Sequence, residues 1–173
     1  MTTYETYLDI VNSATPAQIE AASVWYFEAQ EVAEDVAELL STSLEVGASI
    51  VASFSPRERW SSNVAKSYAF ANGKPVTGLS NNLAMAMSSV TLGFNALKGL
   101  KTNAFARAIA GDKDAVVIDT WMIKAAGMES SKGVSKKEYK ELSLAVTEVA
   151  NRIKLTPRTT QALIWIIARG SHA

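Results

Sequence analysis

Apolar positions recur along this chain at three- and four-residue intervals, and runs with the two-residue alternation of a β-strand are few. Polar and glycine-rich breaks separate the periodic segments. The pattern predicts an all-α protein with helices over residues 3–13, 15–40, 44–54, 55–72, 81–89, 91–97, 101–110, 135–153 and 156–170, and a further short helix after residue 119.

Four predicted helix starts carry capping signals. Thr15-Pro16-Ala17-Gln18, Ser55-Pro56-Arg57-Glu58, Ser135-Lys136-Lys137-Glu138 and Thr156-Pro157 combine a hydroxyl side chain with proline at the first helical position, or with Glu or Gln three residues on. Gly73 and Gly170 are expected to end two of these helices.

Two of the helices differ in how their apolar residues are distributed. In the helix over residues 15–40 we expect an inward apolar set that includes Ile19, Val24, Phe27, Val36 and Leu39, with acidic residues outside it. The segment from Leu44 to Phe54 is apolar nearly all round. It should therefore be the buried central helix.

Length and composition limit the classes of protein. The 173 residues suffice for one domain with a substantial core. There is no cysteine, which excludes disulfides, cysteine-ligated zinc and iron–sulfur clusters, and the single histidine, His172, is given no catalytic part. No glycine-rich phosphate loop is present, and no metal site is predicted.

Charge is unevenly spread although the net charge is zero. Residues 1–56 hold nine acidic and no basic side chains, whereas residues 57–173 hold 17 Lys and Arg against eight Asp and Glu. A basic segment of this kind favours contact with nucleic acid. The alternative for the acidic segment is a set of helices with an ordinary solvated face.

The stretch from Leu97 to Gly127 carries the candidate chemistry. A turn around Gly99 precedes the helix that starts near Lys101, and the apolar run Ala115–Ile118 delivers Asp119 to the start of another helix. Backbone N–H groups at helix starts favour anions. The arrangement suits a phosphate group held beside a reactive carboxylate.

This stretch resembles the helix-hairpin-helix DNA glycosylases of the endonuclease III superfamily. The matching pieces are Gly99-Leu100-Lys101-Thr102 and Ile118-Asp119-Thr120-Trp121, and the aspartate lies eighteen positions after the lysine. Depending on the alignment, the hairpin lacks the family's second glycine or is shorter by about two residues, and Trp121 stands where the best-known members have histidine. The resemblance covers roughly residues 44–170.

The resemblance implies a two-lobed helical domain over residues 1–173. It would consist of acidic N-terminal helices (1–43), a central lobe (44–127) with the hairpin at 94–105, and C-terminal helices (128–173). It also implies double-stranded DNA as partner, a monomer, no iron–sulfur cluster, and room for a monovalent cation at the hairpin.

The implied activity is excision of a damaged or modified base turned out of the duplex. Asp119 would stabilise the positive charge that develops on the sugar, or act as a base. Lys101 would form a Schiff base and cleave the strand, or contact phosphate. DNA contacts fall to Lys98, Gly99 and Thr102 in the hairpin, and to Ser55, Arg57 and Arg59 at the other helix junction.

Several alternatives stay open. Asp119 is also a normal N-cap for its helix, and a carboxylate can serve both roles. Trp60, Trp121 and Trp165 are expected in the core rather than as base-stacking groups. The rival functions are a DNA-binding protein that kept the fold but lost catalysis, and a helical protein-interaction module.

The expected location is the cytoplasm. No stretch reaches eighteen apolar residues, and the N-terminus lacks the basic start of a signal peptide. The sequence therefore predicts no membrane segment.

Overall fold

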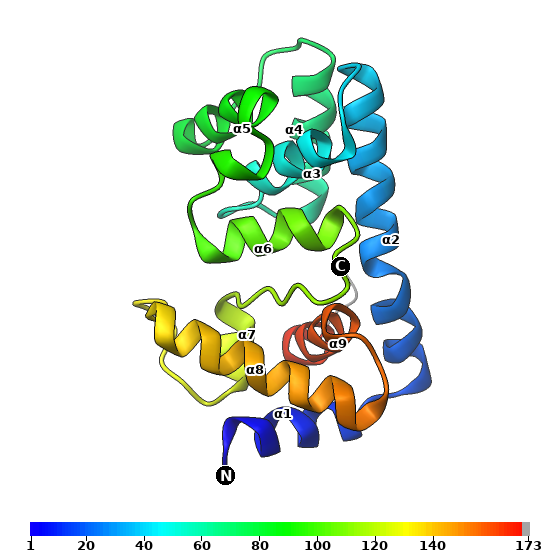
Figure 1. Cartoon of the computed structure of the whole chain (residues 1–173), viewed down its shortest axis with the longest axis vertical. Helices are drawn as coiled ribbons and strands as arrows, with labels where there is room; N and C mark the ends of the chain where they lie inside the picture. The colour runs from blue at the N-terminus through cyan, green and yellow to red at the C-terminus, as the bar shows by residue number, and fades with distance from the viewer. Residues whose placement is uncertain (171–173) are drawn as a thin grey trace. The chain divides into compact units, whose positions relative to one another are not determined.

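The computed structural model describes residues 1–170, and the prediction about His172 concerns a residue outside this range. All regular structure in that range is helical, which confirms the all-α prediction. The helices are α1 (Thr3–Asn12), α2 (Pro16–Leu39), α3 (Leu44–Ser53), α4 (Trp60–Ala71), α5 (Ser80–Leu92), the 3₁₀ helix η1 (Gly93–Ala96), α6 (Leu100–Ile109), α7 (Thr120–Ala125), α8 (Lys136–Ile153) and α9 (Pro157–Arg169) (Figure 1).

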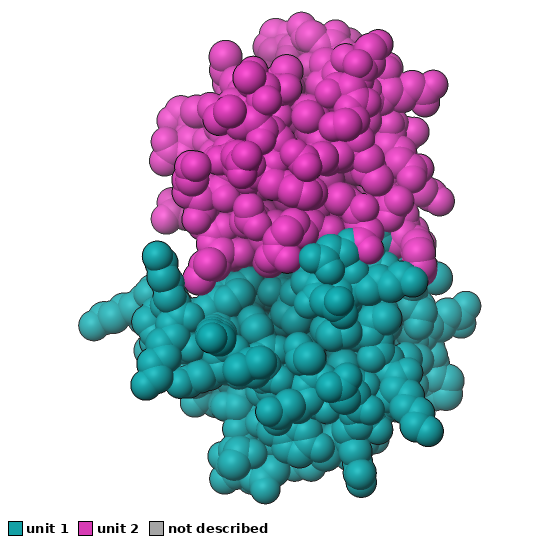
Figure 2. All heavy atoms as spheres, viewed as in Figure 1, with its two compact units in different colours: residues 1–26, 112–173 teal, residues 27–111 magenta. Residues whose placement is uncertain are grey.

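The chain divides into two compact units (Figure 2). Unit 1 consists of residues 1–26 and 112–173, and unit 2 of residues 27–111. The chain passes from one unit to the other inside α2 and again after α6. Unit 1 contains ten acidic and ten basic residues and unit 2 seven of each, so the charge asymmetry along the sequence does not persist in the units.

In unit 1, α9 packs against α1, α7 and α8. Its core includes Leu142, Val146, Leu163 and Ile164, each at most 2% exposed. Three of the predicted caps are present here: the Thr15–Gln18 and Ser135–Glu138 boxes form reciprocal hydrogen bonds, and Thr156 caps α9. Local capping therefore placed these helix starts correctly.

In unit 2, α3 is the central helix and packs against α4, α5, α6 and η1. All its residues from Val46 to Ser53 are buried, as predicted. Gly47 allows a close approach to α2, because a Cβ atom there would meet the carbonyl oxygen of Ala33. Across the α3–α5 contact, the hydroxyls of Ser53 and Ser89 are 3.2 Å apart.

The predicted capping box at Ser55 is wrong. Residues 55–59 form a turn, and α4 begins only at Trp60 with no side-chain cap. The Ser55 hydroxyl donates to the Ala52 carbonyl at 2.6 Å, and Arg57 has φ +59°, which is incompatible with a helix. Glu58 instead accepts hydrogen bonds from Ser62 and Lys66.

The predicted inward face of α2 is also wrong, except at Val36. Ile19, Val24, Phe27 and Leu39 are 40–56% exposed. The buried positions are Ala22, Tyr26, Ala29, Ala33, Val36 and Ala37, which follow the helical period equally well. Alanines line the face because they allow close helix packing, which a search for large apolar residues overlooks.

Helix α5 is longer than predicted. It starts at Ser80, so Leu79 rather than Ser80 is its N-cap, and it continues to Leu92. It therefore includes the first two residues of the separate helix that was predicted over residues 91–97. Gly93, with φ +56°, ends it and η1 follows. The segment before the turn at Gly99 is thus a 3₁₀ helix.

Within residues 1–170, no single helix is both long and apolar enough to cross a membrane. Helices α2 and α3 together have that length and composition, but the pair is bent by 112°.

Candidate functional site

Asp119 is the N-cap of α7, and both its carboxylate oxygens accept hydrogen bonds. Oδ1 accepts from the backbone N–H of Met122 at 2.9 Å, and Oδ2 accepts from the indole Nε1–H of Trp165 at 2.7 Å. The residue is half-buried. The N-cap interpretation is therefore confirmed, and the carboxylate is held in one orientation by two donors.

The extended run Ala115–Ile118 positions Asp119, and all four of its residues are buried. Tyr139 of α8 fixes this run, since its hydroxyl donates to the Val116 carbonyl at 2.9 Å and accepts from the Ile118 N–H at 3.3 Å. The backbone just before α7 is thus tied to the core of unit 1.

Aromatic and cationic side chains lie around this carboxylate in unit 1. The Trp165 ring meets Trp25 edge-on at 5.6 Å between centroids, and the Arg169 guanidinium lies 4.4 Å from the Trp165 ring centroid. Burial, and secondly the negative charge of Asp119, raise the pKa values of Tyr7 and Tyr26 well above the ordinary tyrosine value. Both phenols stay protonated as hydrogen-bond donors.

Those phenols have defined acceptors. The Tyr7 hydroxyl donates to the Met122 carbonyl at 2.8 Å, and the Tyr26 hydroxyl donates to Gln161 Oε1 at 2.7 Å. The backbone of Met122 therefore accepts from Tyr7 through its carbonyl and donates to Asp119 through its N–H. Residues from α1, α7 and α9 thus form one polar network around the candidate carboxylate.

Arg158 is a buried cation that the sequence analysis missed. It is 4% exposed, and its guanidinium lies 5.4 Å from the Tyr26 ring centroid. Burial lowers its pKa, while Tyr26 and the carboxylate of Asp112 oppose that change. Its position right after the Thr156–Pro157 cap gives no sign of burial, because first-turn residues are usually exposed.

The tryptophan predictions have mixed outcomes. Trp121 is 38% exposed, so its expected place in the core is wrong, and the Lys124 ammonium lies 4.9 Å from its ring centroid. Trp60 and Trp165 are half-buried. The bond from Trp165 to Asp119 joins residues 46 positions apart, so no local pattern could have predicted it.

In unit 2, the turn at Gly99 presents an uncapped helix start. Gly99 is the N-cap of α6 and offers no side chain, while Lys98 and Lys101 are exposed beside it. The Asn103 side-chain amide donates to the carbonyls of Phe94 and Leu97 at 3.1 and 3.2 Å and so fixes the turn. Thr102 is only 9% exposed, which leaves its hydroxyl little access to a ligand.

The second predicted DNA-contacting segment belongs to the same unit. Arg57 and Arg59 are exposed in the turn before α4, and Ser55 is half-buried. Trp60 packs edge-on against Phe105 of α6, with 6.3 Å between ring centroids. Since Phe105 is in the middle of α6, the start of α4 lies beside the middle of α6 in unit 2.

The predicted residues therefore divide between the units. Asp119 belongs to unit 1, whereas Lys101 and the six predicted DNA contacts belong to unit 2. Within residues 1–170, no three His, Cys, Asp or Glu side chains gather as metal ligands.

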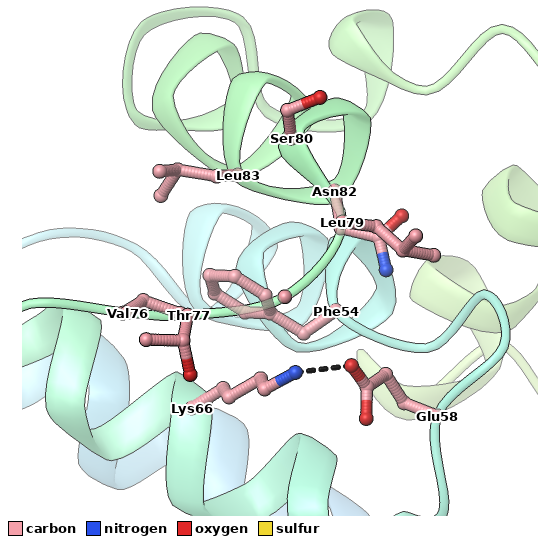
Figure 3. A pocket seen from close by; sticks show the side chains of 10 residues that line it. Phe54, Glu58, Lys66, Val76, Thr77, Leu79, Ser80, Asn82 and Leu83 are labelled. Carbon is pink, nitrogen blue, oxygen red and sulfur yellow. Dashed lines mark hydrogen bonds and ion pairs between the residues drawn. The ribbon is translucent and has the colours of Figure 1, made fainter.

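Unit 2 also has a pocket of about 360 Å³ that the sequence analysis did not predict (Figure 3). Phe54, Leu79 and Leu83 supply apolar lining, and the Lys66–Glu58 ion pair supplies the charged part. Gly78, with φ +124°, passes so close to this ion pair that a Cβ atom at this position would clash with the Lys66 ammonium.

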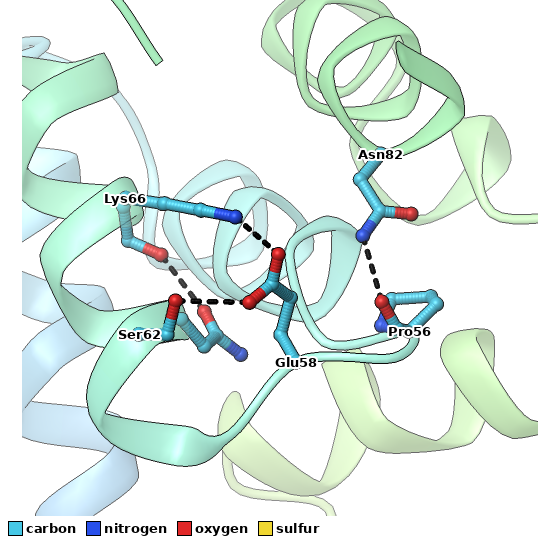
Figure 4. A network of polar contacts seen from close by, with 7 residues as sticks. Pro56, Glu58, Ser62, Lys66 and Asn82 are labelled. Atoms are coloured by element: carbon cyan, nitrogen blue, oxygen red, sulfur yellow. Dashed lines mark hydrogen bonds and ion pairs between the residues drawn. The ribbon is translucent and has the colours of Figure 1, made fainter. Parts of the chain in front are cut away.

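The charged groups of this pocket already have partners (Figure 4). Glu58 accepts from Lys66 and, at 2.9 Å, from the Ser62 hydroxyl, and these bonds lower the pKa of the Glu58 carboxyl. Asn82, 4% exposed, donates to the Pro56 carbonyl at 2.9 Å. These bonds join α4 and α5 to the turn at residues 55–59.

Comparison with known proteins assigns the chain to a family. It belongs to a family of unknown function, DUF7178, which matches residues 2–172. Searches of curated proteins and of solved structures each found no match.

Proposed function

We propose that this protein is a DNA N-glycosylase, in which Asp119 acts on the sugar of a flipped nucleotide and unit 2 binds the duplex. The observation that carries the proposal is the way in which the Asp119 carboxylate is held in place. A half-buried carboxylate at a helix start is held by the Met122 N–H and the Trp165 indole. Cleavage of an N-glycosidic bond develops positive charge on the sugar, and a fixed negative group lowers the energy of that state.

The two hydrogen bonds favour electrostatic stabilisation over proton abstraction. Each N–H donor stabilises the ionised carboxylate and makes it a weaker base. A fixed carboxylate also needs no reorganisation when the positive charge forms. Asp119 would therefore stabilise the cationic sugar while water attacks, and its oxygens keep lone pairs that can orient that water.

DNA binding would use the exposed groups of unit 2. Lys98 and Lys101 flank the free N–H groups at the start of α6, a combination suited to a phosphate. Arg57 and Arg59 lie in the turn before the neighbouring helix. Lys101 is exposed, which supports a phosphate contact, whereas a Schiff-base role requires the desolvation that activates an amine.

A second candidate function is DNA binding without catalysis. The observation that favours it is the same pair of bonds to Asp119, because capping α7 and anchoring Trp165 would explain the carboxylate without any reaction. In that case unit 2 would bind DNA and Asp119 would only stabilise unit 1.

Single-turnover base release from duplexes with damaged, mispaired or modified bases tests the proposal. Asp119→Asn keeps a residue that caps helices well but removes the charge. Asp114→Asn, in the loop before the buried run, is the matched control. We expect release by the wild type and by Asp114→Asn, and a loss of about 100-fold or more in Asp119→Asn.

Duplex affinity as a function of salt separates the remaining outcomes. Salt-dependent binding without release from any duplex would support the non-catalytic alternative. Absence of binding at low salt would exclude both functions and leave the protein-interaction module.

A further inference from the structure

Residues 75–97 form an uncharged stretch that the proposed function does not use. These 23 residues contain no Asp, Glu, Lys, Arg or His, although charged residues make up 20% of the chain. The stretch includes the whole of α5 and η1. A surface helix normally directs charged residues to solvent, so its exposed face needs another explanation.

The fully buried residues of α5 are small or polar, while several of its large apolar residues are exposed. Its buried positions are Asn82, Ala86 and Ser89, and the last of these contacts Ser53 of α3. We call the outward set the α5 ridge; it consists of Leu79, 39% exposed, Leu83, half-buried, Met87, 61% exposed, and Val90, 45% exposed.

The α5 ridge is continuous along the helix. Its members are four, four and three residues apart, so they lie on one side of the helix. Thirteen residues of α-helix extend about 20 Å. A contiguous apolar strip of this length on a monomer surface is typical of an interaction site.

We propose that the α5 ridge binds a second copy of this chain, with α5 packed against its counterpart about a two-fold axis. The absence of charge carries this choice of partner. A two-fold interface places the same surface against itself, so a charge near the two-fold axis would face its own copy. The α5 ridge avoids that cost entirely.

The spacing fits helix-on-helix packing. Ridges formed by residues four apart interdigitate when two helices cross at about −50°, with axes 8–10 Å apart. Leu83 and Met87 lie at the middle of the α5 ridge, so in the dimer each would lie near the same residue of the second copy. Leu79, the N-cap of α5, forms the end of the α5 ridge that borders the Lys66–Glu58 pair.

Other partners fit less well. DNA requires Lys or Arg against its phosphates, and helices that lie on membranes carry basic residues on their polar face. The uncharged stretch supplies neither. The DNA-contacting residues proposed above lie outside it, so dimer formation and DNA binding can be tested separately.

Sedimentation equilibrium of the wild-type chain, measured to about 1 mM, tests the proposal. We expect the mass to rise from 18.6 kDa towards twice that value with concentration. Met87→Glu should keep the protein monomeric throughout. Leu144→Glu is the matched control, because Leu144 is 51% exposed on α8 of unit 1, and it should dimerise like the wild type.

A cysteine variant tests the same contact without adding charge. Because the chain has no cysteine, Met87→Cys introduces a single thiol. A short bis-maleimide should link two copies of Met87→Cys and not two copies of Leu144→Cys. A wild type that stays monomeric at every concentration would overturn the proposal, and so would a dimer that Met87→Glu leaves intact.

Discussion

In unit 1, hydrogen bonds between residues far apart in the chain surround one carboxylate, whereas in unit 2 small residues let helices pack closely around α3. Tyr7, Tyr26 and Trp165 direct their polar atoms inward in unit 1. Unit 2 uses Gly47 and alanine or serine contacts, and the lysines and arginines among its predicted DNA contacts are exposed. The proposed function assigns a division of labour to these units, with catalysis in unit 1 and duplex binding in unit 2.

The largest stability effect is expected where unit 2 has no space. Gly47→Ala places a methyl group against the Ala33 carbonyl, which is backbone and cannot move aside cheaply. We expect the free energy of unfolding to fall by about 3 kcal/mol, measured by urea titration. Gly99→Ala is the control, since φ is −71° and a Cβ atom there meets only Thr102 Oγ1 at 3.8 Å. A similar loss in both variants would show that close packing is not what sets Gly47 apart.

A smaller difference is expected between a buried tyrosine, Tyr26, and a half-buried one, Tyr68. Tyr26→Phe leaves Gln161, 4% exposed, without its hydroxyl donor, so we expect a loss of about 1–3 kcal/mol in the free energy of unfolding. Tyr68→Phe removes an exposed bond to Asp35 in unit 2 and should cost about 0.5 kcal/mol. Equal losses would contradict the contrast between a buried polar network and exposed polar groups.

The smallest effect concerns pH. The hydrogen bond to Asp35, then burial, raises the pKa of Tyr68 to about 12, above the ordinary value of 10. The folded state therefore binds more protons than the unfolded state between these values, and stability must fall from pH 10 to about 12. Absorbance titration of the phenols should show this ionisation moving to lower pH in Asp35→Asn. An unchanged titration would contradict the assigned cause.

The helix starts that the sequence predicted correctly depend on hydrogen bonds between residues close together in the chain. The caps at Thr15, Ser135 and Thr156, and Asp119 as N-cap, required only residues within one turn. The all-α class followed from periodicity alone.

The failures have a common physical cause. The Ser55–Glu58 pattern matched a capping box, but Glu58 pairs with Lys66, eight residues away, so the local bonds did not form. In α2 the buried face consists largely of alanines. In the site, Trp165 and Arg158 were missed because their contacts depend on tertiary packing. Such contacts leave no periodic trace in one sequence.

The measurement that tests the division of labour most directly compares catalysis and binding in two variants. Asp119→Asn and the Lys98→Ala/Lys101→Ala double variant are assayed for duplex affinity and for single-turnover base release at saturating protein. We predict that Asp119→Asn loses about 100-fold or more in rate with unchanged affinity, while the double variant loses affinity and salt dependence with unchanged rate. Release that persists undiminished in Asp119→Asn, or that no duplex supports, would contradict a catalytic carboxylate in unit 1.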